Sequence, residues 1–417
     1  MKRSALAFCL LFGLVANACG GTSARSSTST GGDTSSGGNT NAGGDPSTGG
    51  AANGNFVAKS ITAGLDHTCA ELSDGTIQCW GDNSNAQLGN GNKTGSSVPV
   101  TVTGITNAVD VAAGDWHTCA LLNGGTIQCW GHNYNGQLGN GTATDSSVPV
   151  TVTGITNATA IAAGAEHTCA LLGDGTVQCW GAAPGIAIPS TDVGVFIPVA
   201  VSGFSDATAI ATGNSHTCVL LGDETVQCVG QNNQGELGNG TTQGGGPVTA
   251  AGVTTAIAVA AGGNHSCALL AEGSIQCWGL APGNGTTGSA VPVTVTSVVR
   301  ALAVAAAGGS ATCSVYGAGG DIIGTEICYY DRTCAVVGLG SVQCWGSGML
   351  GDGNSSGSST AVTVIGIANA MSVVTAMRHS CAVLDGGSVT CWGSNSTGQL
   401  GNGNATDSST PVTVKGF

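Results

Sequence analysis

The chain has 417 residues, of which 72 are glycine and only 8% are charged. An average globular protein is about 25% charged and about 7% glycine. So few charges exclude a coiled coil or a long helical array, because their exposed faces need charged residues. The net charge of −14 argues against a nucleic-acid partner, since phosphate binding requires clustered lysine and arginine. A glycine-rich, turn-rich, all-β protein is the class that remains.

The first 18 residues predict an export signal. Lys2 and Arg3 precede an apolar run that is shorter than the about 20 residues a transmembrane helix needs. Small residues then stand directly before Cys19, and this arrangement resembles a bacterial lipobox, in which the cysteine becomes the lipid-modified first residue. We therefore expect residues 1–18 to be a signal peptide and Cys19 to carry a lipid anchor. Secretion without an anchor is the alternative.

Residues 19–55 predict a flexible tether between the anchor and a folded body. They are rich in glycine, serine, threonine and asparagine, and no branched aliphatic or aromatic residue appears before Phe56. Such a segment cannot form a hydrophobic core. The order of signal, cysteine, tether and body predicts an outer-membrane or cell-surface lipoprotein whose only membrane contact is its lipid.

From residue 56 onward the sequence consists of seven copies of one unit. Six copies begin a Cys-containing motif with histidine, and the remaining copy has Arg332 in that place. In every copy a second cysteine follows the first by ten residues, and most of these second cysteines precede Trp-Gly. A unit of about 52 residues is too long for ankyrin, tetratricopeptide or leucine-rich repeats and suits a four-stranded propeller blade.

The second unit illustrates the expected strands. They cover residues 108–113, 117–122, 126–130 and 148–152, and the turns between them are rich in glycine, asparagine and aspartate. No segment has helical periodicity. We predict an all-β fold in which residues 56–417 form a seven-bladed β-propeller of four-stranded blades.

The repeat is similar to that of the regulator of chromosome condensation family. The segments 114–121 (GDWHTCAL) and 133–141 (NYNGQLGNG) carry the resemblance, which extends over all seven copies and departs from the family pattern at Val229 and Arg332. The resemblance implies a seven-bladed propeller. The family's best-known member exchanges guanine nucleotide on a nuclear GTPase, which we do not expect of an exported protein. Its secreted bacterial members, which inhibit other proteins, are the better analogue.

In an exported protein the paired cysteines predict disulfides. A three-residue turn such as Asn123-Gly124-Gly125 would place the two cysteines of a unit directly opposite each other, at a distance that a disulfide can span. Free buried thiols are one alternative, and zinc is another, although zinc sites use closer cysteine spacing. The expected pairs are Cys69–Cys79, Cys119–Cys129, Cys169–Cys179, Cys218–Cys228, Cys267–Cys277, Cys334–Cys344 and Cys381–Cys391.

The sixth unit contains an insertion with two further cysteines, Cys313 and Cys328. The simplest pairing joins these two and leaves Cys334 with Cys344. A nested pairing, Cys313 with Cys344 and Cys328 with Cys334, remains open. We expect the insertion to be a disulfide-stapled loop.

No motif predicts catalysis, because the chain lacks a phosphate-binding loop, a Gly-x-Ser-x-Gly elbow and a His-Glu-x-x-His motif. The repeated histidines occupy equivalent places in different blades, so we expect them to form blade hydrogen bonds. We expect no cofactor; Gly-Asn-Gly loops faintly resemble calcium-binding repeats but lack their aspartates. A sialidase-like propeller enzyme is the alternative function, since three arginines can clamp a carboxylate. Its residues would be Arg300, Arg332 and Arg378.

Positions that differ between the copies are free to bind a partner. In a four-stranded blade the first and third connections open on the same face, and exposed aromatic side chains there are typical of interface hot spots. We expect a monomeric scaffold that binds an extracellular or envelope protein, or a polysaccharide. Its candidate binding face contains Asp66, Asp82, Trp116, His132, Tyr134, Glu166, Asn264 and Arg378.

Overall fold

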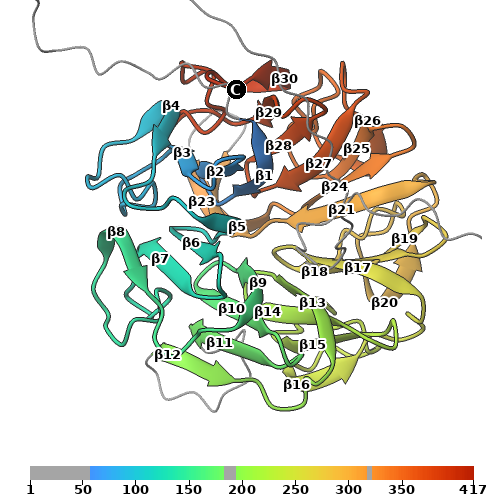
Figure 1. Ribbon diagram of the computed structural model, residues 1–417. Helices are drawn as coiled ribbons and strands as arrows, with labels where there is room; N and C mark the ends of the chain where they lie inside the picture. Colours follow the sequence, from blue (N-terminus) through green and yellow to red (C-terminus); the bar gives the residue numbers. More distant parts are fainter. Residues whose placement is uncertain (1–56, 183–193, 317–321) are drawn as a thin grey trace, which may run out of the picture. The chain divides into compact units, whose positions relative to one another are not determined.

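Seven four-stranded antiparallel sheets surround one axis in the computed structural model, which describes residues 57–182, 194–316 and 322–417 (Figure 1). The predicted seven-bladed β-propeller is therefore confirmed. The predicted signal peptide, the lipid-anchor Cys19 and the tether to residue 55 lie outside the described residues. Within the described ranges, no helix is long and apolar enough to cross a membrane.

Each blade is built from strands that follow one another in the chain, and the first strand of each blade is innermost. These innermost strands are β1 (Ala58–Ala63), β5 (Ala108–Ala113), β9 (Ala158–Ala163), β13 (Ala207–Thr212), β17 (Ala256–Ala261), β21 (Ala301–Ala307) and β27 (Ala370–Thr375). The second strands are β2 (His67–Leu72), β6 (His117–Leu122), β10 (His167–Leu172), β14 (His216–Leu221), β18 (His265–Leu270), β24 (Arg332–Val337) and β28 (His379–Leu384).

The third strands are β3 (Ile77–Gly81), β7 (Ile127–Gly131), β11 (Val177–Gly181), β15 (Val226–Gly230), β19 (Ile275–Leu280), β25 (Ser341–Gly346) and β29 (Val389–Gly393). The outer strands are β4 (Ser96–Thr101), β8 (Ser146–Thr151), β12 (Val195–Ala200), β16 (Gly245–Thr249), β20 (Gly288–Thr294), β26 (Ser358–Thr363) and β30 (Ser408–Thr413). Six outer strands contain a proline, which has no N–H to offer a further strand. In β26 the corresponding residue is Ala361, and its N–H donates to Ser297 Oγ at 3.3 Å.

Hydrophobic clusters between neighbouring blades form the core. At the interface of the first two blades, Leu88 and Val102 pack with Leu122 and Trp130, and a comparable cluster fills each of the other interfaces. The second strand of most blades is buried along its whole length, because blades cover both of its faces. Small threonine, cysteine and alanine side chains in that strand therefore suit the close approach of the sheets.

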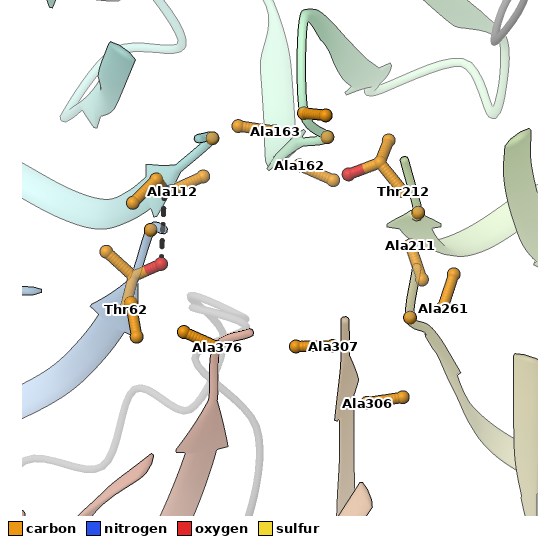
Figure 2. A pocket seen from close by; sticks show the side chains of 18 of the residues that line it. Thr62, Ala112, Ala162, Ala163, Ala211, Thr212, Ala261, Ala306, Ala307 and Ala376 are labelled. Atoms are coloured by element: carbon orange, nitrogen blue, oxygen red, sulfur yellow. Dashed lines mark hydrogen bonds between the residues drawn. The ribbon is translucent and has the colours of Figure 1, made fainter. Parts of the chain in front are cut away.

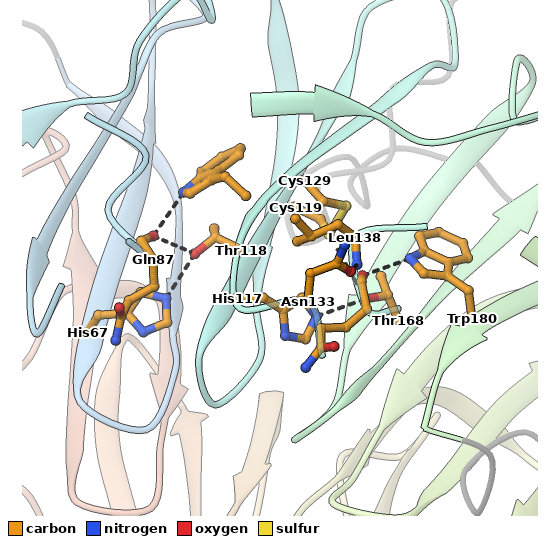
Figure 3. The surroundings of a disulfide bond; sticks show 12 residues. His67, Gln87, His117, Thr118, Cys119, Cys129, Asn133, Leu138, Thr168 and Trp180 are labelled. Atoms are coloured by element: carbon orange, nitrogen blue, oxygen red, sulfur yellow. Dashed lines mark hydrogen bonds between the residues drawn. A yellow bond between two sulfur atoms is a disulfide. The ribbon is translucent and has the colours of Figure 1, made fainter. Parts of the chain in front are cut away.

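A ring of hydrogen bonds also joins the blades (Figure 3). His67 Nε2 lies 2.9 Å from Thr118 Oγ1, and the Thr118 hydroxyl donates to the Gln87 carbonyl at 2.9 Å. Trp130 Nε1 donates to the same carbonyl at 2.8 Å. The histidine-to-hydroxyl contact recurs at His117, His167, His216, His265 and His379. This geometry matches the expected structural role of the repeated histidines.

Two glycines make room for this ring in each of the first five repeats, whereas Ala376 takes the place of the first glycine in the seventh. A Cβ on Gly64 would collide with the imidazole of His67 and with the Gly114 carbonyl. Gly81 has a φ of 106°, and a Cβ there would lie 2.8 Å from the His67 Cα. Only glycine combines that backbone conformation with such close approach.

Seven disulfides staple the hairpins of the second and third strands. Register places each cysteine directly opposite its partner, as in the Cys119–Cys129 pair, whose Cα atoms are 4.0 Å apart. All seven expected pairs are present. Cys334 is bonded to Cys344, which rules out the nested alternative, whereas the side chains of Cys313 and Cys328 lie outside the described part of the structure.

The ring closes by packing the first blade against the last, without exchanging a strand. Sheets β1–β4 and β27–β30 each use consecutive strands. Ala58 N donates to Gly387 O at 3.1 Å, and Trp80 Nε1 donates to Gln399 O at 2.9 Å. The closing interface therefore repeats the contacts of the others, which the sequence had left open.

The insertion of the sixth unit is a β-hairpin rather than the expected loop. Strands β22 (Ser310–Tyr316) and β23 (Ile322–Tyr329) form a two-stranded sheet of their own between β21 and β24. At its base, the buried Asp331 accepts from the backbone N–H of Asn264 at 2.9 Å and contacts His265 Nδ1 at 3.2 Å. The hairpin is thereby anchored to the fifth blade.

Candidate functional site: the loop face and the channel mouth

The connections between first and second strands, and between third and fourth strands, lie together on what we call the loop face. The other connections form the opposite turn face. A central channel of about 340 Å³ runs between the innermost strands. Figure 2 shows its wall, made of alanine and threonine side chains that include Thr62, Ala112, Ala162 and Thr212. The charged residue that lines the channel, Asp115, lies in the connection that follows β5, on the loop face.

At the loop-face mouth of the channel, an ion pair joins the first and seventh blades. Arg378 Nη1 lies 3.0 Å from Asp66 Oδ2, while Gln399 Nε2 donates to Asp66 Oδ1 at 3.0 Å. Asp82 accepts from Ser84 Oγ and from Gln87 Nε2. Burial raises the pKa of Asp66, although the Arg378 charge acts in the other direction. Asp66 and Asp82 are thus largely engaged within the protein.

The second blade brings Trp116 and His132 into contact and has Tyr134 on the same loop as His132. The rings of Trp116 and His132 meet edge to face, with centroids 6.0 Å apart, and Gln137 Nε2 donates to His132 Nδ1 at 3.0 Å. Tyr134 follows two residues after His132 and is 74% exposed. This aromatic group offers apolar area and hydrogen-bonding groups on one accessible surface.

Glu166, on the third blade, is tied to the aromatic group through the loop between them. Asn135 Nδ2 donates to Glu166 Oε2 at 2.9 Å. Beside Glu166 lies Asp115, which the sequence analysis missed, and its carboxylate has no hydrogen bond within the described residues. Burial, with Glu166 and Asp66 nearby, raises the pKa of Asp115 to about 7. An alignment of the repeats could have revealed Asp115, because the equivalent residues in three other units, Leu65, Ala165 and Met377, are uncharged.

A pocket of about 170 Å³, which we call the blade 2–3 pocket, opens between these carboxylates. Asp115, Glu166 and His167 line it together with Asn214 and Ser215. Among the described residues, no group of three or more His, Cys, Asp or Glu side chains is arranged to hold a metal ion. The pocket therefore offers several hydrogen-bond acceptors without metal geometry.

Asn264 differs from the other predicted face residues because it is only 7% exposed. Its Nδ2 contacts Asp331 Oδ2 at 3.3 Å, at the base of the inserted hairpin. Asn264 thus supports the hairpin and adds little accessible surface.

The three arginines of the enzyme alternative do not lie together. Arg332 is 3% exposed, and its guanidinium donates to Ser347 O and Ser380 Oγ in the histidine's place. Burial lowers the pKa of Arg332 to about 10. Arg378 follows an innermost strand, whereas Arg300 precedes one, so the two lie on opposite faces of the ring. They cannot clamp one carboxylate in this arrangement.

An asparagine side chain organises the glycine-rich loops. Asn83 Nδ2 donates to the carbonyls of Asn92 and Thr94, each at 3.0 Å, and lies 3.2 Å from Asn90 Oδ1. Asn133, Asn232 and Asn395 repeat this arrangement. An amide N–H therefore occupies the point where these loop oxygens converge.

Two family models match the chain, and both are described as the regulator of chromosome condensation (RCC1) repeat. One matches residues 74–121 and 125–171; the other matches residues 58–87, 108–137, 207–236, 256–285 and 378–399. No curated protein has a significant sequence match to the chain.

Several solved structures share the fold. Human WBSCR16 is 19% identical with a TM-score of 0.70, covering 82% of this chain and 94% of its own. Yeast RCC1 (Prp20), in its complex with Kap60, is 20% identical with a TM-score of 0.65, and the match covers 87% of this chain and 85% of the yeast chain. The CRINKLY ectodomain of the Arabidopsis thaliana receptor kinase ACR4 is 20% identical with a TM-score of 0.50, covering 81% and 96%. At these identities the likeness shows the fold alone.

Proposed function

Because the chain belongs to the RCC1 repeat family, we propose that it is a protein-binding scaffold of the cell envelope, with the loop face as its binding surface. Fold alone does not set function, so the proposal depends on the site. The observation that carries it is the aromatic group of Trp116, His132 and Tyr134, which lies beside the acidic channel mouth.

The disulfides support a location outside the cytoplasm. Seven cross-strand disulfides indicate an oxidising environment, because cytosolic and nuclear thiols are kept reduced. With the predicted export signal, this favours a protein outside the cytoplasm that is anchored by lipid on Cys19. For the same reason we do not extend nuclear nucleotide exchange to this chain.

Binding, and not catalysis, is the proposed activity. The arginines of the enzyme alternative are separated or buried, and the carboxylates at the mouth lie beside a pocket of about 170 Å³ and the exposed Tyr134. A polysaccharide is the alternative ligand, because tryptophan and tyrosine rings also present flat apolar faces to sugars.

Capture from envelope extract tests the proposal. The immobilised full-length protein is expected to retain a defined protein, and the double variant Trp116→Ala/Tyr134→Ala to lose at least tenfold of it, since hot-spot truncations cost about 2 kcal/mol or more. Leu339→Ala is the matched control, because Leu339 is 99% exposed on the turn face. Equal loss in the control, capture unaffected by the aromatic substitutions, or retention of polysaccharide alone would contradict the proposal.

A further inference from the structure

Two carboxylates and a histidine line the blade 2–3 pocket, together with Asn214 and Ser215, whose side chains can donate as well as accept. The Asp115 carboxylate has no hydrogen bond within the described ranges, and one oxygen of Glu166 is held by Asn135. His167 also lines the pocket; it is 1% exposed, and its Nδ1 has no partner among the described residues. Such a set of atoms suits a ligand that donates hydrogen bonds.

The hydrogen-bond ring determines which nitrogen of His167 can accept. The hydroxyls of Thr118 and Thr168 donate to backbone carbonyls, so each must accept from the histidine that faces it. His167 Nε2 lies 3.0 Å from Thr217 Oγ1, and we infer from the two preceding interfaces that it carries the proton. Nδ1 is then an unprotonated acceptor, and burial keeps the ring neutral by lowering the pKa of His167 to about 4.

The channel mouth already holds one cation of this protein. The Arg378 guanidinium is paired with Asp66 at 3.0 Å, on the blade next to Asp115. No cation of the described chain is paired with Asp115 or Glu166. At the mouth, therefore, Asp66 is paired with a cation of the protein, whereas Asp115, one blade further, is not.

We propose that the blade 2–3 pocket binds the ammonium or guanidinium group of a basic side chain on the protein partner. The volume of about 170 Å³ is comparable with a cavity that accepts benzene, so it accommodates the end of a lysine or arginine side chain. Glu166 supplies the opposite charge together with Asp115, which a bound cation would hold in its ionised form, and His167 Nδ1 accepts a further N–H. Through Asn135, which follows Tyr134, the pocket is continuous with the aromatic group.

The proposal rests on the proposed binding function and adds the chemistry of the ligand. A tetralysine peptide is the probe, and its Nε-acetylated form is the uncharged comparison. Calorimetry with the full-length protein at low salt is expected to show binding of tetralysine alone. Asp115→Asn is expected to weaken it at least tenfold, and Glu166→Gln at least threefold.

A matched control separates the pocket from the general negative charge of the protein. Glu272→Gln removes one charge from an exposed turn on the opposite face and is expected to change affinity less than twofold. The proposed cation pocket would be overturned if Glu272→Gln and Asp115→Asn lost the same affinity for tetralysine, or if the acetylated peptide bound as tightly as tetralysine. Unchanged melting temperatures and disulfide content show that the variants are folded.

The two proposals fail in different ways. If the wild type captures an envelope protein and Asp115→Asn captures it equally well, the scaffold stands and the cation pocket is wrong. If no protein is captured while tetralysine binding still depends on Asp115, the pocket stands and the envelope partner is wrong. If the protein bound an amino-sugar oligomer more tightly than tetralysine, the proposal that the ligand is a basic side chain would be wrong.

Discussion

At the scale of single residues, one threonine connects three groups at the interface of the first two blades. Thr118 accepts from His67, donates to the Gln87 carbonyl and shares that carbonyl with Trp130. All of these side chains are fully buried, so each polar atom depends on its partner. The small hydroxyl thereby fixes both the tautomer of the histidine and the position of the neighbouring loop.

Removal of that hydroxyl should destabilise the ring. Thr118→Val retains the shape but leaves the His67 N–H unpaired in the core, which costs about 1–3 kcal/mol. The measurement is the shift of the urea unfolding midpoint. Thr101→Val, on the exposed edge of β4, is the control and should change stability by less than about 0.5 kcal/mol. Equal midpoints for the two variants would mean that the ring adds no stability.

At the scale of elements, the hairpin of the second and third strands is the unit that repeats most faithfully. Its disulfide and its buried strand recur in all seven blades, and its glycine turn recurs in six, because Glu224 has the positive φ in the fourth blade. Irregularities gather at the sixth blade. The short connection between β19 and β20 leaves Trp345 Nε1 without a partner among the described residues, and Arg332 replaces a histidine beside the inserted hairpin.

Loss of one disulfide should weaken its hairpin without unfolding the ring. Cys119→Ala/Cys129→Ala opens a loop of about 11 residues, which chain entropy values at no more than about 3 kcal/mol. The rest of β6 and β7 stays paired, and the neighbouring blades still cover them. Thermal melting should fall while the β-sheet circular dichroism is retained. Loss of the folded signal at 25 °C would show that the staples are required for folding.

Spacing alone predicted the elements that depend on local sequence. The blades, the strand positions and the opposed cysteines follow from turns and from the ten-residue interval. Contacts between distant units escaped prediction: Asp331 reaches back to bury Asn264, and the insertion pairs as β22 and β23. At the site, Trp116 and His132 were placed together correctly, whereas Asp115 was missed because its importance comes from Glu166 and Asp66 on adjacent blades.

At the scale of the whole molecule, burial in the ring keeps five of the interface histidines neutral. Burial lowers the pKa to about 4 for His67 and His167 and to about 3 for His117, His216 and His379. Burial also raises the pKa of Asp110 and Asp115 to about 7, with Glu71 adding to the effect at Asp110. These two sets act on stability in opposite directions as the pH changes.

The histidines should dominate, so acid should destabilise the propeller. Between about pH 6.5 and 4 the unfolded chain binds protons at five histidines that the folded chain excludes, and stability therefore rises with pH. The two aspartates take up protons in the folded chain below about pH 7 and favour it in acid, but they are fewer. The melting temperature should fall steeply from pH 6.5 to 4.5. His117→Gln, which removes one of the five sites, should make that slope shallower. A flat profile, or a melting temperature that rises on acidification, would show that these histidines are not held neutral by the ring.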